Sequence, residues 1–318
     1  MPSSWRKLFQ APYRSWRWLQ NQPSLLRLAW LCSLSLPSIE RVATISWCLR
    51  SLFNPRLRWN GIIRYEMGRD TVGLTRTDAL RAMTGGVLEK LLDQRLSFGR
   101  QAHPDEVWPD LRDIALRLAS QIEQLRHRYP THPVILSPFH YVSQHAYVYI
   151  IDEVRKALKL KTISAVTGVS SHQRDRDARV MPHIEPLHTN DKGNRNNLAL
   201  RVVQALRRDG IVVLFSDAPP FTMDKFPMDT VGVSILGRPS RIHDGAFRIG
   251  ARMDALLLPF YLRFTHGRFD AHAFSAIELK AADAPQQVAD CISGALTNNY
   301  AHWLMAGYPP MYAFSCVR

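Results

Sequence analysis

The stretch VILSPFHYVSQH, residues 134–145, decides the fold, because an apolar strand ends there at a Ser-Pro-Phe-His turn and a helical pattern follows at once. A helix is predicted over residues 142–158, where apolar side chains repeat every four residues on one face: Ala146, Ile150, Val154 and Leu158. His140 therefore lies at a strand-to-helix turn. A neutral imidazole there can act as a general base towards a hydroxyl. The alternative is that His140 only caps the turn and packs under the helix.

Strand and helix patterns alternate through the rest of the chain. Apolar runs predict strands at 134–137, 162–167, 211–216, 231–236, 255–264 and 268–275, and amphipathic patterns predict helices at 108–129, 246–253 and 284–304. The segment RPSRIHDG, residues 238–245, is predicted to be a break. This alternation predicts an α/β fold with a largely parallel central sheet flanked by helices. Sites in such sheets lie off the carboxyl ends of strands, where His140 and Asp217 both fall.

The first hundred residues predict a different organisation. Residues 1–100 are expected to form a helical, membrane-associating extension, and residues 101–318 the α/β domain. Within the extension, residues 75–96 predict a pair of helices broken at Gly85-Gly86. The uncharged run 28–39 is well short of the roughly 20 apolar residues that a spanning helix needs, and it contains Pro37. We therefore expect a peripheral or monotopic attachment.

Charge and aromatic content favour an anionic membrane surface as a partner. The chain has 41 Lys plus Arg against 27 Asp plus Glu, a formal net charge of +14, and nucleic acid or an anionic membrane fits that balance. The first 20 residues mix basic and aromatic side chains, as interfacial membrane segments do: Trp5, Arg6, Lys7, Phe9, Tyr13, Arg14, Trp16, Arg17 and Trp18. No recognisable nucleic-acid motif follows, so nucleic acid is the less favoured partner.

The cysteines are scattered along the chain, at positions 32, 48, 291 and 316, without metal-ligand spacing or a disulfide framework. This usage is typical of a reducing compartment.

Taken together, these segments resemble the lysophospholipid and lipid A acyltransferase superfamily, and within it the late lipid A acyltransferases of bacteria. The family shows a His-X4-Asp or His-X4-Glu motif after its first core strand. It also shows a strand ending in Asp, Gly-Arg-Pro-like residues, and a small-residue helix before a Pro-Phe strand. The matching residues here are Asp217, Leu236-Gly237-Arg238-Pro239, and Gly245-Ala246 leading to Leu258-Pro259-Phe260. The likeness covers about residues 105–315, including the ending HWLMAGYPPMY. It depends on the order and spacing of these motifs along the chain.

The resemblance implies an acyltransferase that moves a fatty acyl group from acyl carrier protein or coenzyme A to a hydroxyl of a lipid or glycolipid. It implies that the enzyme is located at the cytoplasmic face of a bacterial inner membrane and that the reaction needs no cofactor and no metal. His140 would be the base, and Asp217 would be its orienting carboxylate or a structural partner. Arginines would bind substrate phosphate: Arg174, Arg176, Arg179 and Arg238. Apolar side chains at 221, 223, 226 and 228 would line an acyl channel or simply pack.

One position departs from the family pattern. His145 stands where the family has the carboxylate that orients and polarises the base. Three consequences stay open. In the first, Asp217, or less readily Asp152 or Glu153, replaces the missing charge. In the second, His145 hydrogen-bonds His140 directly. In the third, proton abstraction has been lost. In the last case the protein is a non-catalytic relative that binds lipid or acyl chains, or scaffolds a membrane complex.

Two other interpretations of this segment are less favoured. A metal bound by His140 and His145 would need ligands at i, i+4 and a third partner, but the offset is five residues and no Cys or carboxylate lies near in sequence. Ser143 as a nucleophile would need the small-residue elbow of Gly-X-Ser-X-Gly hydrolases, which SPFHYVSQH lacks.

Overall fold

The computed structural model describes residues 26–102, 106–168, 183–189, 195–220 and 229–306 of the chain. Within these ranges a seven-stranded sheet has the order β3-β2-β4-β1-β7-β8, with β9 also paired to β7. The strands are β1 (Val134–Pro138), β2 (Ile163–Thr167), β3 (Ile184–His188), β4 (Ile211–Val213), β7 (Leu256–Thr265), β8 (Arg268–Ala273) and β9 (Ile277–Glu278). Pairing is parallel from β3 to β7, and β8 and β9 run antiparallel to β7.

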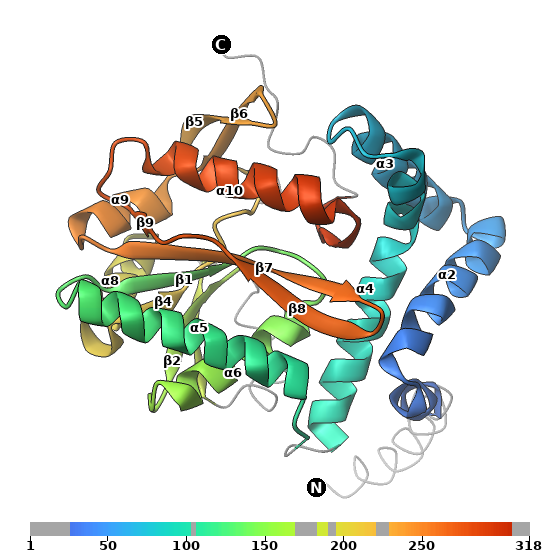
Figure 1. The fold of residues 1–318 in the computed structure, drawn as a ribbon, viewed down its shortest axis with the longest axis horizontal. Helices are drawn as coiled ribbons and strands as arrows, with labels where there is room; N and C mark the ends of the chain where they lie inside the picture. The colour runs from blue at the N-terminus through green and yellow to red at the C-terminus, as the bar shows by residue number, and fades with distance from the viewer. Residues whose placement is uncertain (1–25, 103–105, 169–182, 190–194, 221–228, 307–318) are drawn as a thin grey trace, which may run out of the picture.

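Helices flank this sheet, so the predicted α/β fold with a largely parallel sheet is confirmed. They are α5 (Pro109–Arg128), α6 (Gln144–Ala157), α8 (Arg195–Asp209), α9 (Gly245–Arg252) and α10 (Ala284–Asn299), and the short 3-10 helix η3 (Tyr300–His302) follows α10. Figure 1 shows α5 and α10 on opposite sides of the sheet. Every residue of β1 is buried as a result, which explains its unbroken apolar run.

The described part of the first hundred residues is helical, as predicted. Residues 26–33 are helical, and α2 (Leu36–Phe53), α3 (Pro55–Asp70) and α4 (Arg76–Ala102) follow. Helices α2 and α3 both pack against α4, and α4 contacts α6 and η3; α4 stands between α2 and the sheet in Figure 1. Within the ranges given above, no helix combines the length and apolar character needed to cross a membrane.

The predicted break at Gly85-Gly86 was wrong, since α4 runs unbroken from Arg76 to Ala102. Gly85 is needed there for space and not for a turn. A Cβ at this position would lie 2.3 Å from the Arg64 guanidinium and 2.4 Å from the Ala301 carbonyl oxygen. Gly85 thus reflects close packing against partners far away in sequence, whereas a Cβ at Gly86 would lie 4.0 Å from Arg64.

The predicted break at 238–245 was also wrong. Residues Arg238–His243 form β6, which pairs antiparallel with β5 (Thr230–Ile235) in a hairpin beside the main sheet. Its two-residue turn, Leu236-Gly237, has φ angles of 51° and 72°, the left-handed conformation that such hairpins require. Strands β3 and β9 were not predicted. Strand β4 ends at Val213 instead of 216, and α10 ends at Asn299 instead of 304.

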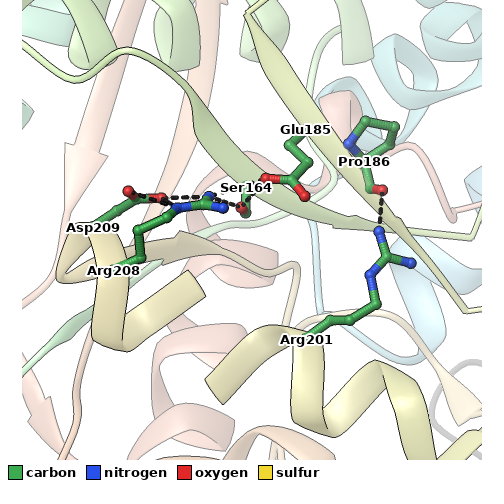
Figure 2. Close-up of polar contacts among 6 residues, drawn as sticks. All are labelled: Ser164, Glu185, Pro186, Arg201, Arg208 and Asp209. Carbon is green, nitrogen blue, oxygen red and sulfur yellow. Dashed lines mark hydrogen bonds and ion pairs between the residues drawn. The ribbon is translucent and has the colours of Figure 1, made fainter. Parts of the chain in front are cut away.

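Helix α8 is tied to the β2–β3 edge of the sheet through two arginines (Figure 2). Arg208 donates to Ser164 Oγ at 3.2 Å and to Glu185 Oε2 at 3.0 Å, and Arg201 donates to the Pro186 carbonyl oxygen at 3.3 Å. Hydrogen bonds from Arg208 to Asp209 and Glu185 raise the pKa of its guanidinium. The edge strand β3 is thereby held against the body of the domain.

Candidate active site

The His140 turn lies at the carboxyl edge of the parallel strands. Strand β1 ends at Pro138, and the next residue continues the pairing, because Phe139 N–H donates to the Phe260 carbonyl oxygen at 2.8 Å. Strand β4 lies beside β1 with Val213 opposite Leu136, so the chain leaving β4 passes the same edge. His140 and Asp217 are thus brought together from two adjacent strands, as the order of patterns in the sequence indicates.

Asp217 contacts His140 through both carboxylate oxygens. Oδ1 lies 2.7 Å from the imidazole Nδ1, and Oδ2 accepts a hydrogen bond from the His140 backbone N–H, also at 2.7 Å. The carboxylate is 1% exposed and the imidazole side chain 14% exposed. An ionised carboxylate only accepts hydrogen bonds, so neutral His140 carries its proton on Nδ1 and its lone pair on Nε2. An imidazole held in that tautomer is ready to accept a proton at Nε2.

Aromatic side chains hold the imidazole plane. The Phe215 ring lies 4.5 Å from the His140 ring, centroid to centroid, and Tyr147 packs edge-on against Phe215 at 5.6 Å. The Tyr147 hydroxyl accepts a hydrogen bond from Leu262 N–H at 3.2 Å. Burial raises the pKa of this phenol well above its usual value, so Tyr147 stays a neutral packing group. Phe215, two residues before Asp217, connects the orienting carboxylate to this aromatic wall.

The backbone of the turn is held by a segment close to the end of the described chain. Leu304 N–H donates to the His140 carbonyl oxygen at 2.9 Å, and Val142 N–H donates to the His302 carbonyl oxygen at 2.8 Å. Tyr141 and Trp303 pair as an antiparallel bridge between these bonds. Val142 has φ 67°, which is unfavourable for a β-branched residue. The pairing with residues 302–304 holds this backbone in place.

Arg64, on α3, fixes that segment in turn. Its buried guanidinium donates to the carbonyl oxygens of Ala82, Ala301 and Trp303 at 2.8, 3.0 and 3.1 Å. Burial, helped by the charge of Arg64, lowers the pKa of the neighbouring His302 to about 4. His302 is therefore neutral at ordinary pH, and the charge beneath the turn belongs to Arg64.

A second carboxylate, Asp93 on α4, meets the start of α6. Its Oδ1 accepts hydrogen bonds from the Ser143 hydroxyl at 2.5 Å and from His145 N–H at 3.2 Å, and the His145 Nδ1 lies 3.6 Å from the same oxygen. Ser143 caps α6, because its Oγ accepts from Ala146 N–H at 3.1 Å. The buried Ser143 hydroxyl thus serves the helix cap and binds Asp93, and among the described residues no hydrogen bond joins it to a histidine.

Glu89 lies one helical turn before Asp93 on α4. Burial raises its pKa to about 7, and the Asp93 charge adds to the rise, while Arg64, Lys90 and His140 oppose it. An acid of this strength changes its protonation near neutral pH. Sequence reasoning missed both Glu89 and Asp93, because their spacing of four indicates only a shared helix face and not what that face meets.

Of the predicted site residues, the structure brings His140 and Asp217 into direct contact. His145 lies beside Asp93 instead of completing a pair with His140, and in the described chain no hydrogen bond joins the two imidazoles. Arg238 is exposed on β6 and donates to the Asp70 carbonyl oxygen at 2.9 Å. Arg174, Arg176 and Arg179 lie outside the described residues, as do the predicted channel positions 221, 223, 226 and 228.

Asp152, considered as a replacement carboxylate, belongs to a different cluster. Its carboxylate binds Arg100 at 3.0 Å and Arg155 at 2.9 Å. Burial disfavours its charged form, but the hydrogen bond from Arg155 and the nearby charges outweigh burial and lower the pKa of Asp152. In the same described ranges, no three His, Cys, Asp or Glu side chains are grouped to hold a metal ion.

Comparison with known proteins assigns no family to the chain. No protein-family model matches the sequence, and no curated protein matches it.

Proposed function

We propose that the protein is a membrane-associated acyltransferase that moves a fatty acyl group from an acyl thioester, acyl carrier protein or coenzyme A, to a hydroxyl of a lipid or glycolipid. The observation that carries the proposal is the His140–Asp217 pair, with Nδ1 and Oδ1 2.7 Å apart at the carboxyl edge of a parallel sheet. The resemblance of the segments around this pair to late lipid A acyltransferases supplies the substrate class.

The reaction uses the free lone pair on His140 Nε2. The acceptor hydroxyl gives its proton to Nε2 as its oxygen attacks the thioester carbon. The new ester C–O bond forms, the C–S bond breaks, and the departing sulfur takes the proton back from the imidazolium. Asp217 stabilises that imidazolium through the hydrogen bond to Nδ1, as an aspartate does in other acyl-transfer sites. The balance requires no oxidant, reductant or cofactor.

In this proposal Asp217 supplies the negative charge that the family motif places five residues after the base. The carboxylate at 217 is 1% exposed and contacts the imidazole directly, so it does the same orienting work from a neighbouring strand. His145 then serves the second cluster, through Asp93. The basic surface, with Arg174, Arg176, Arg179 and Arg238 as substrate-phosphate contacts, fits an acidic carrier and an anionic lipid at the cytoplasmic face of a bacterial inner membrane.

One observation favours a second candidate. His145 occupies the acidic position of the motif and lies by Asp93, which favours a catalytically impaired relative that binds lipid or acyl chains, or that scaffolds a membrane complex.

Lipid mass spectrometry of cells separates the two candidates. Cells expressing the wild-type chain, His140→Ala, or His127→Ala, which removes an exposed histidine on α5, are scanned for lipids heavier by one acyl group. We expect the heavier lipid with wild type and His127→Ala and not with His140→Ala. Identical profiles, with every variant folded, would support the non-catalytic relative.

A restored acid adds a second criterion. His145→Glu returns the carboxylate of the family motif. Unchanged or lower activity is expected if Asp217 already serves His140, because the new charge beside Asp93 only adds repulsion. A large gain in activity would show that the natural site is impaired.

A further inference from the structure

The outward face of α2 carries a row of large apolar side chains. Ile45, Leu49, Leu52 and Phe53 are 59%, 59%, 67% and 88% exposed, and Trp59 on the neighbouring α3 is 62% exposed. On α2 they follow one another at i, i+4, i+7 and i+8, which places them on one helical face. We call these five residues the α2–α3 apolar face.

The outer face of α2 differs from that of a helix covering a water-soluble domain. The inner face of α2 buries Ile39 and Ala43 and packs against α4, and the outer face of such a helix is normally polar. Of the other exposed large apolar residues, Leu26 and Trp30 lie on the helical stretch before α2, and the rest stand singly along the chain: Leu80, Val107, Leu116 and Leu200. The four residues on α2 form a contiguous apolar strip along one helical face, and such a strip indicates a surface that is covered by something.

Along the stretch that carries this face, residues 41–65, every charged side chain is basic, whereas Glu40 precedes the stretch on α2 and the exposed Glu66 and Asp70 follow it on α3. Residues 41–65 contain no Asp or Glu, while Arg41, Arg50, Arg56 and Arg58 are all exposed there. The preceding sequence, residues 1–25, repeats the combination of tryptophan with arginine. Arginine next to tryptophan and aliphatic side chains is what a helix lying in an anionic membrane interface needs.

We propose that the α2–α3 apolar face docks on an anionic lipid bilayer, with its apolar side chains at the boundary of headgroups and acyl chains and its arginines on lipid phosphates. A second copy of this chain fits less well, because two such faces would bring eight like charges together. The choice of a bilayer as the partner rests on the proposed function. Binding to the bilayer can nevertheless be measured without any acyl transfer.

Docking through this face bears on the candidate site. Helices α2 and α3 pack on α4, and α4 carries Asp93, whose carboxylate binds Ser143 and the backbone of His145. The bilayer would therefore lie on the outer side of the helices that brace the His140 turn. An acceptor drawn from the membrane would have to pass around the edge of this layer to reach Nε2.

The first test is co-sedimentation of the full-length protein with vesicles of phosphatidylcholine containing phosphatidylglycerol, and with vesicles of phosphatidylcholine alone. Leu49→Glu and Phe53→Glu place a charge on the apolar face, and Arg56→Glu/Arg58→Glu reverses its rim. The matched controls are Leu116→Glu and Arg112→Glu on the exposed face of α5. We expect the first group to lose about tenfold or more in partition to the anionic vesicles, and the controls to bind like wild type.

The second test reports insertion at one position. Cys48 is exposed on α2 next to Leu49, so a polarity-sensitive fluorophore can be attached there after Cys32, Cys291 and Cys316 are changed to Ser. Its emission should shift to the blue on anionic vesicles. The same fluorophore on Leu116→Cys, in a chain that also lacks Cys48, should not shift.

Circular dichroism of every variant establishes that the fold is intact. The proposal is overturned if the α2–α3 variants partition like wild type, or if label at Cys48 stays in water while the protein sediments with vesicles. It is also overturned if the variants change only the oligomeric state by light scattering, which would assign the face to a second copy. Because the vesicles contain no acyl donor, the proposed catalysis can fail without affecting this result.

Discussion

The guanidinium of Arg64 donates to the carbonyl oxygen of Trp303 at 3.1 Å, and the two residues are 239 positions apart in the chain. Trp303 pairs with Tyr141 in the His140 turn, so a helix outside the sheet determines the position of the candidate base. With its bonds to Ala82 and Ala301, Arg64 satisfies three backbone carbonyls in a buried environment.

Replacing Arg64 should therefore destabilise the whole domain. Arg64→Met keeps much of the side-chain volume but leaves three carbonyl oxygens without their donor, and each loss costs about 1 kcal/mol or more. We expect the free energy of unfolding to fall by roughly 3 kcal/mol in urea titrations. Arg69→Met, at an exposed position on the same helix, is the control. Equal stability of the two variants would contradict this role of Arg64.

The adjacent glycines of α4 should respond to alanine with opposite signs. A Cβ at Gly85 would lie 2.3 Å from Arg64 Nη2 and 2.4 Å from the Ala301 oxygen, whereas one at Gly86 would approach Arg64 no closer than 4.0 Å. Gly86→Ala should gain up to about 1 kcal/mol from helix propensity. Gly85→Ala should lose about 1–3 kcal/mol from overpacking. Thermal unfolding of the pair measures both, and a stabilised Gly85→Ala would show that the contact relaxes freely.

Glu89 should make stability depend on pH. Its pKa is about 7 in the fold against 4.5 as its ordinary value, so the folded state binds this proton more tightly than the unfolded state. The resulting stabilisation is complete below about pH 4.5 and is lost as the pH rises through 7. Glu89→Gln should thus match wild type at pH 4 and be more stable at pH 8, by at most about 3 kcal/mol.

The control for this titration is Glu123→Gln, which alters an exposed glutamate on α5. Denaturant unfolding at a series of pH values gives the difference between each variant and wild type. A difference for Glu89→Gln that does not change with pH would mean that this carboxyl is ionised in the fold like an ordinary glutamate.

Under the proposed function, the two carboxylates near the turn should differ in their effect on rate. Asp217→Asn offers its amide nitrogen or oxygen to Nδ1 but no negative charge for the imidazolium, so kcat should fall by about 100-fold or more with little change in KM. Asp93→Asn keeps an acceptor for Ser143 and the His145 N–H, so its loss should stay below about tenfold. Initial rates with the acceptor found by lipid analysis measure both; equal losses would assign no special role to Asp217.

Local patterns predicted the parts of the structure that depend on neighbouring residues. The β1 strand, its turn and α6 follow from apolar periodicity, and the alternation of strands with helices yields the parallel sheet. The contact of His140 with Asp217 was one of several alternatives, and strand ends at a common sheet edge made it possible to anticipate.

The errors have a common physical cause. Gly85-Gly86 has the composition of a break, but its partner is Arg64 on a different helix. Leu236-Gly237-Arg238-Pro239 has the composition of a loop, but cross-strand pairing with β5 makes residues from Arg238 onward a strand. Asp93 and Glu89 lacked any local signal, because their significance depends on how α4 packs against α6. Tertiary contacts, and not intrinsic preference, decide each of these positions.

The hydrogen bond between Arg64 and Trp303 also sets an order of assembly. During synthesis the strands β1 and β4 can leave the ribosome long before residues 301–304, yet two backbone hydrogen bonds of the His140 turn, from Leu304 N–H to the His140 carbonyl and from Val142 N–H to the His302 carbonyl, need that late segment. Contacts separated by 239 residues require closure of a very long loop. Until Trp303 has been translated, the His140 turn of the nascent chain therefore lacks these hydrogen bonds. Chaperones would bind the incompletely folded chain during that period.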